Sequence, residues 1–583
     1  MNSLLHKLAR HGDISWLSYY FAEFITTQSG IDINDLVGFS AALVCEANQN
    51  GDVCIDLDTY NNAPLFVSSH FDTAELPHGI DSSRWIEHLR ANRCVGETQD
   101  TAPLILDGKR LYLHRYWYYE NRVAESIIAK LNIADNSDDR SIACHVDGLF
   151  SASDTHDLDQ KHAVTMAATK HFSVISGGPG TGKTTTVIRI LSTLVTQQPN
   201  IRIALVAPTG KAAARMMDSI QNRIDSLDLA SDARQDIPNR ASTIHRLLGY
   251  RHRSFRYDRN HRIPVDCIVV DEASMIDLKL MFHLLDALPD HARMILLGDR
   301  DQLASVSAGN VLGDITGHGH SLKSAPVNIA GSIALLRHSY RFAASGGIGK
   351  LAELVNLGQS REAIELLESG NSHIRWFQTD QDQLDPRALK WILGAFQPIF
   401  SAPSALEALQ THEIARVLVA TNHGPLGVGQ LNRVISSALL AHNGKPESEW
   451  YSGLPIMITR NHHELGLFNG DTGILWQQDE GLRACFRDGD GGIRSLALNR
   501  LPEFTPAWAS TVHKSQGSEF DSVLLILPTD SDSGALSREL LYTAITRARQ
   551  RFMLHAKRDV VSSAIGKLTR RHSGLAQKLG WPG

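Results

Sequence analysis

Residues 177–184 read Gly177-Gly178-Pro179-Gly180-Thr181-Gly182-Lys183-Thr184, which fits the phosphate-binding loop pattern G-x-x-x-x-G-K-[ST] at every fixed position. The apolar run before this stretch, residues 171–176, is typical of a short buried strand. The residues after it, 185–195, carry apolar side chains at helical spacing. The loop therefore lies between a strand and a helix, which is the structural context that the motif requires.

The chemistry of this loop follows from its backbone. Glycines let the chain wrap closely around a phosphate with N–H groups pointing inward, and the helix that begins here adds the positive end of its dipole. Lys183 can reach the β- and γ-phosphates of a nucleotide, and the Thr184 hydroxyl can ligate Mg²⁺. The alternative is an accidental glycine-rich turn, against which the flanking strand and helix argue. The stretch predicts a site for a nucleoside triphosphate.

Composition sets limits on the rest of the chain. A chain of 583 residues is too long for one ordinary hydrophobic core, so we expect three or more domains. With 57 basic and 63 acidic residues the formal net charge is −6, so any nucleic-acid site must be a local basic groove. We find no apolar run long enough to span a membrane and no convincing secretory signal, which favours the cytoplasm. The six cysteines include no C-x-x-C pair, which argues against a zinc or iron–sulfur site.

Two further segments bear on nucleotide chemistry. The apolar run at 267–270 is followed by Asp271 and Glu272, the arrangement of the second triphosphatase element. Asp271 would hold Mg²⁺, and Glu272 would orient or deprotonate the attacking water. The next apolar run, 294–297, is followed by Gln302, which is placed to sense the γ-phosphate. Repeated strand, loop and helix units predict parallel sheets covered on both faces.

The second half of the chain has the same alternation of predicted strands, loops and helices, but its sequence does not repeat that of the first half. Apolar runs at 416–420 and 523–527 predict buried strands. From about 430 to 505 the chain becomes rich in glycine and aspartate, with short apolar segments and hairpin-turn chemistry. We interpret this region as a small β-barrel inserted into a second core domain.

The first 135 residues contain no recognisable catalytic motif. The segment 16–25 predicts an amphipathic helix, 110–119 a strand, and 120–131 a helix. The aromatic density could serve a partner surface. The alternative is the core of a small helical domain. A polar, acidic stretch at 133–157 then indicates a linker or domain boundary.

As an ordered set, the motifs between about residues 157 and 556 resemble those of superfamily 1 helicases. The amino-acid sequences of these motifs most resemble those of the RecD family, the alpha subunits of bacterial exodeoxyribonuclease V. The stretches that carry this resemblance are GGPGTGKTTT, APTGKAAARM, STIHRLLG, VVDEASMID, GDRDQLASV, SYRF, GVGQLN, LFNGDTG, STVHKSQGSEFD and YTAITRAR.

The resemblance implies a role for each matching position. In the ATP site, Lys183 and Thr184 would hold phosphate and Mg²⁺, Asp271 the metal and Glu272 the water, with Gln302 as nucleotide sensor. Arg341 and Arg547 would be arginine fingers from the second core domain. The further nucleotide-binding positions would be Gly177, Gly178, Pro179, Gly180, Thr181, Gly182 and Thr185 of the loop, Gln160 at the adenine, and Gly517 and Glu519, with Glu519 facing the ribose. The single-strand path would be lined by Pro208, Thr209, Thr243, His245 and His513.

The resemblance also implies an architecture. We expect an α/β fold with two RecA-like P-loop NTPase core domains, a helical N-terminal domain and an inserted SH3-like β-barrel. The expected boundaries are 1–140 for a partner-binding domain, 141–330 for the first core domain with a small insertion at about 246–265, and 331–583 for the second, with the barrel at about 430–505.

The implied function is that of an ATP-dependent 5′-to-3′ DNA helicase and single-stranded-DNA-dependent ATPase acting in double-strand break repair. By resemblance its partners are DNA, as single strands and duplex ends, and the RecB and RecC subunits of a heterotrimer, with the nuclease centre outside this chain. Two alternatives stay open: a regulatory or scaffold subunit that binds DNA ends without unwinding, and a P-loop enzyme unrelated to DNA, such as a nucleotide kinase. Two motif-bearing halves count against the kinase, and Gln302, Arg341 and Arg547 count against the scaffold.

Overall fold

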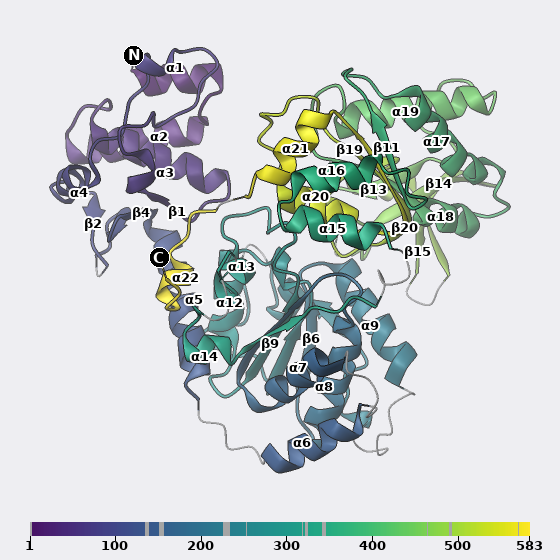
Figure 1. Cartoon of the computed structure of the whole chain (residues 1–583), viewed down its shortest axis with the longest axis horizontal. Coiled ribbons are helices and arrows are strands. Elements are labelled where there is room, and N and C mark those ends of the chain that lie inside the picture. Colours follow the sequence, from purple (N-terminus) through teal and green to yellow (C-terminus); the bar gives the residue numbers. More distant parts are fainter. Residues whose placement is uncertain are drawn as a thin grey trace.

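The computed structural model of the chain describes residues 3–98, 100–133, 139–150, 157–224, 234–251, 254–317, 319–320, 324–340, 346–462, 464–488, 492–569 and 571–582. An N-terminal region, two α/β halves and a C-terminal segment that returns to the N-terminal region make up the molecule (Figure 1). We call residues 139–340 the first half and residues 346–566 the second half. Among the described helices, none combines the length and apolar character needed to cross a membrane.

A parallel sheet forms the centre of the first half. Its strands are β5 (Phe172–Gly177), β6 (Ile203–Ala207), β7 (Ala241–Thr243), β8 (Cys267–Val270), β9 (Arg293–Gly298) and β10 (Ile333–Leu336). They pair in the order β10-β5-β9-β8-β6-β7, and every pair is parallel. The expectation of a parallel sheet is therefore confirmed. Strand β10 lies beyond residue 330, the expected end of the first core domain, yet it completes this sheet.

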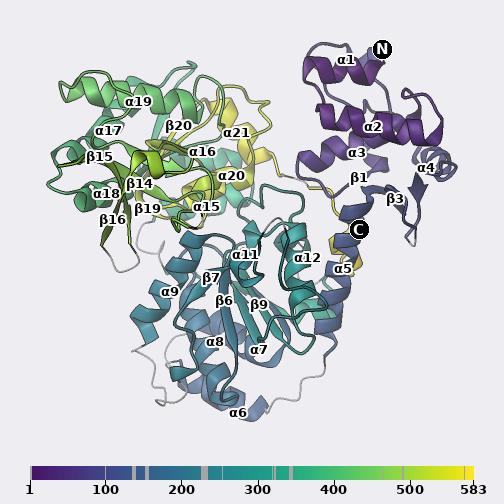
Figure 2. The same ribbon diagram turned by 180° about the vertical axis from the view of Figure 1, so that it is seen from behind.

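Helices cover both faces of this sheet, because successive side chains of a strand point to opposite sides. The helices are α6 (Asp139–Gly148), α7 (Leu158–Thr169), α8 (Lys183–Gln197), α9 (Gly210–Ile224), α11 (Ile244–Leu247), α12 (Leu278–Ala287), α13 (Val311–Ile315) and α14 (Val327–Ala330). Cys267 and Val269 pack into the core that contains α7 and α8, whereas Ile268 and Val270 pack into the core that contains α12. Figure 2 shows the sheet between these layers from behind.

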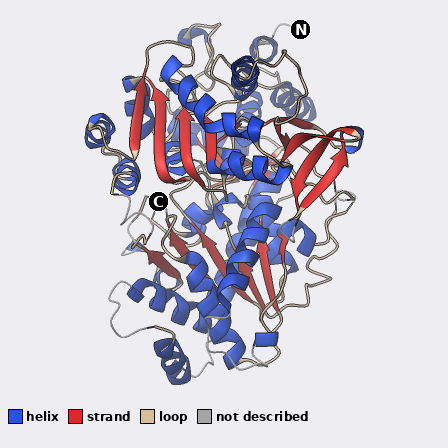
Figure 3. Cartoon of the chain, turned by 90° about the vertical axis from the view of Figure 1, so that its right-hand side faces the viewer, coloured by secondary structure: helices blue, strands red, loops and turns tan. Residues whose placement is uncertain are grey.

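The second half repeats this arrangement. Its parallel strands are β11 (Ile374–Gln378), β12 (Ala415–Val419), β18 (Ala509–Thr511), β19 (Phe520–Ile526) and β20 (Ala548–Ala556), in the order β11-β20-β19-β12-β18. Its helices are α15 (Ile348–Asn356), α16 (Ser360–Glu368), α17 (Pro386–Phe396), α18 (Ala405–Ile414), α19 (Val428–His442), α20 (Arg538–Ile545) and α21 (Arg558–Gly566). Figure 3 shows helices on both sides of the strands in each half. The prediction of two core sheets is confirmed.

An antiparallel sheet is inserted between β12 and β18. Its strands are β13 (Pro455–Ile458), β14 (Thr472–Gln478), β15 (Gly481–Arg487), β16 (Ile493–Ala497) and β17 (Phe504–Pro506), in the order β16-β15-β14-β13-β17. A closed barrel would need a pairing between the edge strands β16 and β17, and the described residues contain none. The expected SH3-like barrel is therefore not confirmed, and the sheet is open.

The N-terminal region is helical as expected, but it also contains a small sheet. Its helices are α1 (Leu4–His11), α2 (Trp16–Ser29), α3 (Leu36–Gln49) and α4 (Ser82–Arg90), and its strands β1 (Cys54–Asp56), β2 (Val95–Gly96), β3 (Leu104–Asp107) and β4 (Arg110–Leu113) pair in the order β1-β4-β3-β2. The strand predicted at 110–119 ends at Leu113, and helix α5 (His114–Leu131) begins at once. The aromatic residues at 116–119 favour a strand by propensity, but burial at helical spacing outweighs that preference.

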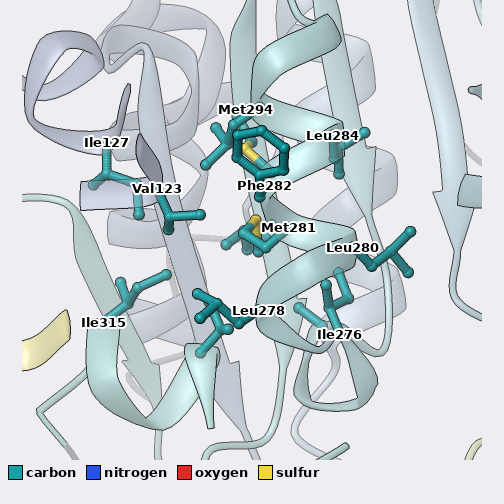
Figure 4. Close-up of a cluster of buried hydrophobic side chains, with 14 of the residues drawn as sticks. Val123, Ile127, Ile276, Leu278, Leu280, Met281, Phe282, Leu284, Met294 and Ile315 are labelled. Atoms are coloured by element: carbon teal, nitrogen blue, oxygen red, sulfur yellow. The ribbon is translucent and has the colours of Figure 1, made fainter. Parts of the chain in front are cut away.

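Helix α5 joins the N-terminal region to the first half. Val123 and Ile127 are fully buried and belong to the same hydrophobic core as Met281 and Leu278 of α12 (Figure 4). Tyr119 stacks on Phe282 of α12 at 4.6 Å between ring centroids. The N-terminal region therefore has a continuous apolar connection to the sheet that carries the phosphate loop.

The C-terminal segment crosses from the second half back to α5 (Figure 1). The His572 backbone N–H donates to Asp52 Oδ1 at 2.7 Å, and the short helix α22 (Leu575–Lys578) packs against α5. At its end, Trp581 Nε1 donates to the Ile315 carbonyl at 3.2 Å. One chain segment thus ties the second half to both the N-terminal region and the first half.

A buried carboxylate anchors this segment, and its removal has a predictable cost. Glu120 is 0% exposed, and it accepts hydrogen bonds from Tyr112 Oη at 3.0 Å, Ser573 Oγ at 2.9 Å and the Gly574 N–H at 2.9 Å. Glu120→Ala leaves these donors unpaired, so the free energy that holds the C-terminal segment closed should fall by about 3 kcal/mol. Amide hydrogen exchange at residues 571–581 measures this opening.

The matched control is Glu125→Ala, on an exposed position of the same helix, where the ion pair with Arg122 contributes little. Exchange in the C-terminal segment should be unchanged in this variant. If Glu120→Ala also left it unchanged, the carboxylate would not be the anchor.

Candidate nucleotide site between the two halves

The phosphate loop requires glycine at particular positions. Gly180 and Gly182 have φ angles of +78° and +84°, a conformation that other residues rarely adopt. At Gly182 a Cβ atom would also lie 2.4 Å from Gln160 Nε2. Helix α8 begins directly at Lys183, with Gly182 as its N-cap and no side-chain cap. The loop therefore leads directly into the N-terminus of a 15-residue helix that has no side-chain cap, and such a terminus suits an anion.

Two side chains fix the shape of this loop. Lys183 Nζ donates to the carbonyl oxygens of Gly177 and Gly178, the first at 2.5 Å and the second at 3.2 Å. Gln160 is 4% exposed, and its Nε2 donates to the Thr181 carbonyl at 3.2 Å. The Lys183 ammonium therefore lies over the start of the loop, in a position where it could contact a bound phosphate group.

Two carboxylates stand at the end of β8. Glu272 has a φ angle of +52°, in the left-handed region that is unusual for any residue but glycine. Its backbone N–H donates to Asp271 Oδ1 at 2.9 Å. Burial, together with the adjacent Glu272 charge, raises the pKa of Asp271 to about 6. A half-buried carboxylate with a second carboxylate beside it is a site whose negative charge a divalent cation would offset.

Asp299 and Gln302, after β9, connect the site to the second half. Asp299 accepts hydrogen bonds from Gln302 Nε2 at 2.9 Å and from Tyr542 Oη of α20 at 3.0 Å. Burial raises the pKa of Asp299 to about 6, although the nearby Lys183 ammonium opposes the rise. Gln302 Oε1 is buried and has no hydrogen-bond partner among the described residues. Gln302, the predicted nucleotide sensor, thus retains an unused acceptor and lines the same cavity as the phosphate loop.

The second half contributes a buried guanidinium. Arg547 is 3% exposed; its Nε donates to the Thr543 carbonyl and its Nη1 to the Ser518 carbonyl, both at 3.1 Å. Glu519 pairs with Arg549 at 3.3 Å. Gly517, with φ +67°, accepts a hydrogen bond from Arg215 of the first half. Arg547 is therefore held in one orientation by the backbone of its own half.

These groups surround one cavity of about 890 Å³ between the two halves. Its lining includes the expected residues Gln160, Pro179, Gly180, Gly182, Lys183, Thr184, Thr185, Asp271, Glu272, Gln302, Gly517, Glu519 and Arg547. The expected positions Gly177, Gly178 and Thr181 belong to the same loop but do not line the cavity. Arg341 lies outside the described residues.

The cavity also has lining residues that the motifs did not indicate. Arg189 of α8 donates to Gln160 Oε1 at 2.8 Å, and the Tyr340 backbone N–H donates to the Gly180 carbonyl at 2.9 Å. Arg215, Arg223 and Arg549 add three more guanidinium groups to the lining. Tyr340 lies within the SYRF stretch, Arg215 within APTGKAAARM and Arg549 within YTAITRAR, so the neighbourhood of each was a signal. Arg189 and Arg223 lie outside every motif stretch and had none. The added cations suit a ligand with several negative charges.

The residues expected along a single strand lie elsewhere. Pro208 and Thr209 follow β6, and Thr243 ends β7; because Ala207 pairs in register with Thr243, these positions share one edge of the first sheet. The His245 ring lies 5.5 Å from the Tyr250 ring, and burial lowers the pKa of His245. His513 follows β18 of the second sheet, and burial lowers its pKa too. None of these residues lines the nucleotide cavity.

Three known protein families match parts of this chain. The family described as the N-terminal domain of the RecBCD enzyme subunit RecD matches residues 10–112, an AAA domain matches residues 160–308, and the UvrD-like helicase C-terminal domain matches residues 506–554. The middle match contains the phosphate loop and the carboxylates of β8, and the last contains Arg547.

Relatives align along nearly the whole chain. The RecBCD enzyme subunit RecD of Mycolicibacterium smegmatis is 37% identical over 559 residues, which are 93% of each chain. The subunit of the same name from Haemophilus influenzae is 33% identical over 99% of each chain. The ATP-dependent RecD2 DNA helicase of Deinococcus radiodurans is 31% identical over 68% of this chain and 48% of its own.

Proposed function

Because this chain belongs to the family of RecD subunits of the RecBCD enzyme, we propose that it is an ATP-dependent DNA helicase that moves 5′ to 3′ along a single strand as a motor subunit of that complex. The observation that carries the proposal is the cavity between the halves. It is lined by the phosphate loop and the β8 carboxylates on one side and by Arg547 on the other. A nucleotide bound there would contact both halves at once, so its hydrolysis would change how they are held together.

Each group has a proposed role in hydrolysis. Lys183 binds the β- and γ-phosphates, and Glu272 orients the attacking water and accepts its proton. Arg547 and Arg341 stabilise the charge that gathers on the transferred phosphoryl group. Gln302 senses the γ-phosphate, and its unpartnered Oε1 can accept a hydrogen bond from the attacking water. Gln160 reads the adenine edge and Glu519 the ribose.

Mg²⁺ fits the donor set of this site. Thr184 and Asp271 would hold it, and the burial that raises the pKa of Asp271 favours a cation beside that carboxylate. When bound, the ion would supply positive charge that offsets the negative charge of the phosphates.

The three-domain division is part of the proposal. A partner-binding domain (1–140) precedes the first core domain (141–330) and the second core domain (331–583). Strand β10 lies just past the first range, although it pairs with β5 of the first core sheet. The loops at 246–265 and the antiparallel sheet within 430–505 are insertions that serve the DNA path. The proposed DNA path would be lined by Pro208, Thr209, Thr243, His245 and His513. We also propose that the protein acts in the cytoplasm, where bacterial DNA lies.

A strand-displacement assay on two duplexes tests the proposed activity. One duplex carries a 5′ single-stranded tail and the other a 3′ tail of the same sequence. The full chain should displace strands from the 5′-tailed duplex only, and only with ATP and Mg²⁺. ATP hydrolysis without displacement on either duplex would favour the regulatory or scaffold alternative instead.

Partner binding is proposed for the N-terminal region, with RecB and RecC as the partners. Helix α2 turns one apolar face to solvent: Trp16, Leu17, Tyr20 and Phe24 are 44%, 60%, 58% and 52% exposed. Ala22 and Ile25 face inward, so the exposed face is not needed for the fold of this region. Contiguous exposed apolar groups of this kind are typical of protein interfaces.

Leu17→Ser combined with Tyr20→Ser and Phe24→Ser should reduce co-purification with RecB and RecC by at least about ten-fold, because buried aromatic anchors dominate interface energetics. Val327→Ser, which changes a residue 87% exposed on the first half, serves as the control and should keep full assembly. Undiminished assembly of the triple variant would rule out this face as the docking surface.

A further inference from the structure

A phenylalanine of the antiparallel sheet touches the first half beside the proposed DNA path. Phe468 lies in the turn between β13 and β14, and the Arg246 guanidinium carbon lies 4.4 Å from the centroid of its ring. A Cβ atom added at Gly210 would lie 3.5 Å from Phe468 Cδ2, so the ring also borders the backbone of Gly210. Gly210 directly follows Thr209, and Arg246 directly follows His245, so the ring meets both loops of that path.

The turn that carries this ring is rigidly held. The Phe468 backbone N–H donates to Asp471 Oδ2 at 2.7 Å, and the Asp471 N–H returns to the Phe468 carbonyl at 3.0 Å. The Gly470 N–H donates to the Ile458 carbonyl of β13 at 2.9 Å. The ring is therefore presented at a fixed position by the sheet, and it is only half-buried.

The surroundings of the ring are cationic. The charges of Lys211, Arg494 and Arg246 act on the Asp471 carboxylate and oppose the rise of its pKa that burial causes. Arg494 Nη1 also donates to the Leu465 carbonyl at 2.6 Å, so Arg246 and Arg494 both lie beside the turn that carries Phe468. Guanidinium groups beside an aromatic ring form a combination that binds single-stranded nucleic acid, with cations for phosphates and a ring for a base.

We propose that Phe468 is the ring on which a base of the single strand stacks, and that Arg246 leaves the ring to pair with a phosphate when DNA binds. The inference rests on the proposed function and names a residue of its DNA path. In the absence of DNA the planar guanidinium covers the ring face that a base would cover. An exposed cation–π contact is weaker than base–aromatic stacking, and Arg246 gains a phosphate in exchange.

The two sides of this contact belong to different halves of the motor. Arg246 belongs to the first half, whereas Phe468 belongs to the sheet inserted into the second half. Any movement of the halves during the ATP cycle changes the spacing between them. A base on Phe468 would therefore be gripped or released in step with that movement.

The test compares two strands of equal length, oligo(dT) and an oligomer with abasic sites in place of the bases. Their affinities for the full chain are measured by fluorescence anisotropy at several salt concentrations. Phe468→Leu should weaken oligo(dT) binding roughly 5- to 150-fold, the range of base–aromatic stacking, and leave binding of the abasic strand unchanged. Phe468→Trp should restore oligo(dT) binding. Phe504→Leu, which alters a ring of the same sheet that packs on Trp450, is the matched control.

Arg246→Gln gives a different signature. Arg246→Gln should weaken the binding of both strands by the same factor. It should also reduce the slope of log affinity against log salt concentration by about one, because one phosphate contact is lost. Phe468→Leu should leave that slope unchanged.

Two results would overturn the inference. If Phe468→Leu weakened both strands equally, the ring would be a structural contact between the halves; if it weakened neither, the strand would not pass here. The proposed function is judged separately, because His245→Ala with His513→Ala should weaken both strands whatever Phe468 does. If the unmodified chain binds neither strand, the proposed function and this inference fail together.

Discussion

Arg547→Ala should bind ATP nearly as tightly as the unmodified chain but hydrolyse it roughly a thousand-fold more slowly, or slower still, as for arginine fingers in general. The guanidinium is 3% exposed and is held by the Ser518 and Thr543 carbonyls, so it is oriented before nucleotide binds. A group fixed in advance adds little to ground-state binding and much to stabilising charge in the transition state. Strand displacement should be lost with hydrolysis.

The measurement is nucleotide affinity beside DNA-stimulated ATP hydrolysis for each variant. Arg551→Ala, on an exposed position of the same strand β20, is the control and should keep both properties. Unmodified hydrolysis by Arg547→Ala would contradict a catalytic site shared between the halves.

Lys183→Gln should lose hydrolysis by at least about a hundred-fold, the effect of removing one aligned donor from a developing oxyanion. Unlike Arg547→Ala, it should also weaken nucleotide binding, because the ammonium lies over the start of the loop at 2.5 Å from the Gly177 carbonyl. Loss of the cation removes a contact made in both the ground state and the transition state. Isothermal titration with a non-hydrolysable ATP analogue measures the binding change.

Lys170→Gln, at the exposed C-terminal end of α7, is the matched control for charge and should change neither quantity. If Lys183→Gln bound the analogue with full affinity, the ammonium would not be a ground-state phosphate contact.

Local patterns predicted the two core sheets and named many of the residues that line the cavity between the halves. The phosphate loop, the carboxylates after β8 and Gln302 after β9 are each short stretches whose residues act where they stand in the chain. Because parallel strands end at one edge of a sheet, a strand followed by Asp271 and Glu272 brings these carboxylates near the loop that follows β5. The order of the strands and motifs along the chain was therefore enough to predict that these residues lie at one edge of the first sheet.

Contacts between the halves could not be predicted in this way. Tyr542 donates to Asp299 across 243 positions of sequence, and Gln516 Nε2 donates to the Leu303 carbonyl across 213. The spacing of Arg189 and Arg223 along their helices gives no sign that a cavity lies beside them. Such residues acquire their environment only from the docking of the two halves, which no local pattern encodes.

The N-terminal region shows a second limit. Leu104–Asp107 pairs with Arg110–Leu113 as a hairpin, which local sequence can indicate, but β1 pairs with β4 across more than fifty residues and was not foreseen. The same limit applies to Glu120, whose burial depends on Ser573 and Gly574 from the far end of the chain. Hairpin chemistry at 430–505 predicted antiparallel strands correctly, but it could not decide whether the sheet closes.

We propose that one chain couples ATP hydrolysis between its two halves to a single strand of DNA. The most direct test is the rate of ATP hydrolysis by the full chain as the concentration of a single-stranded oligonucleotide is raised. The rate should rise many-fold and saturate, and the rise should be absent in Arg547→Ala. An identical rate with and without the oligonucleotide, at concentrations where ATP is bound, would contradict the account.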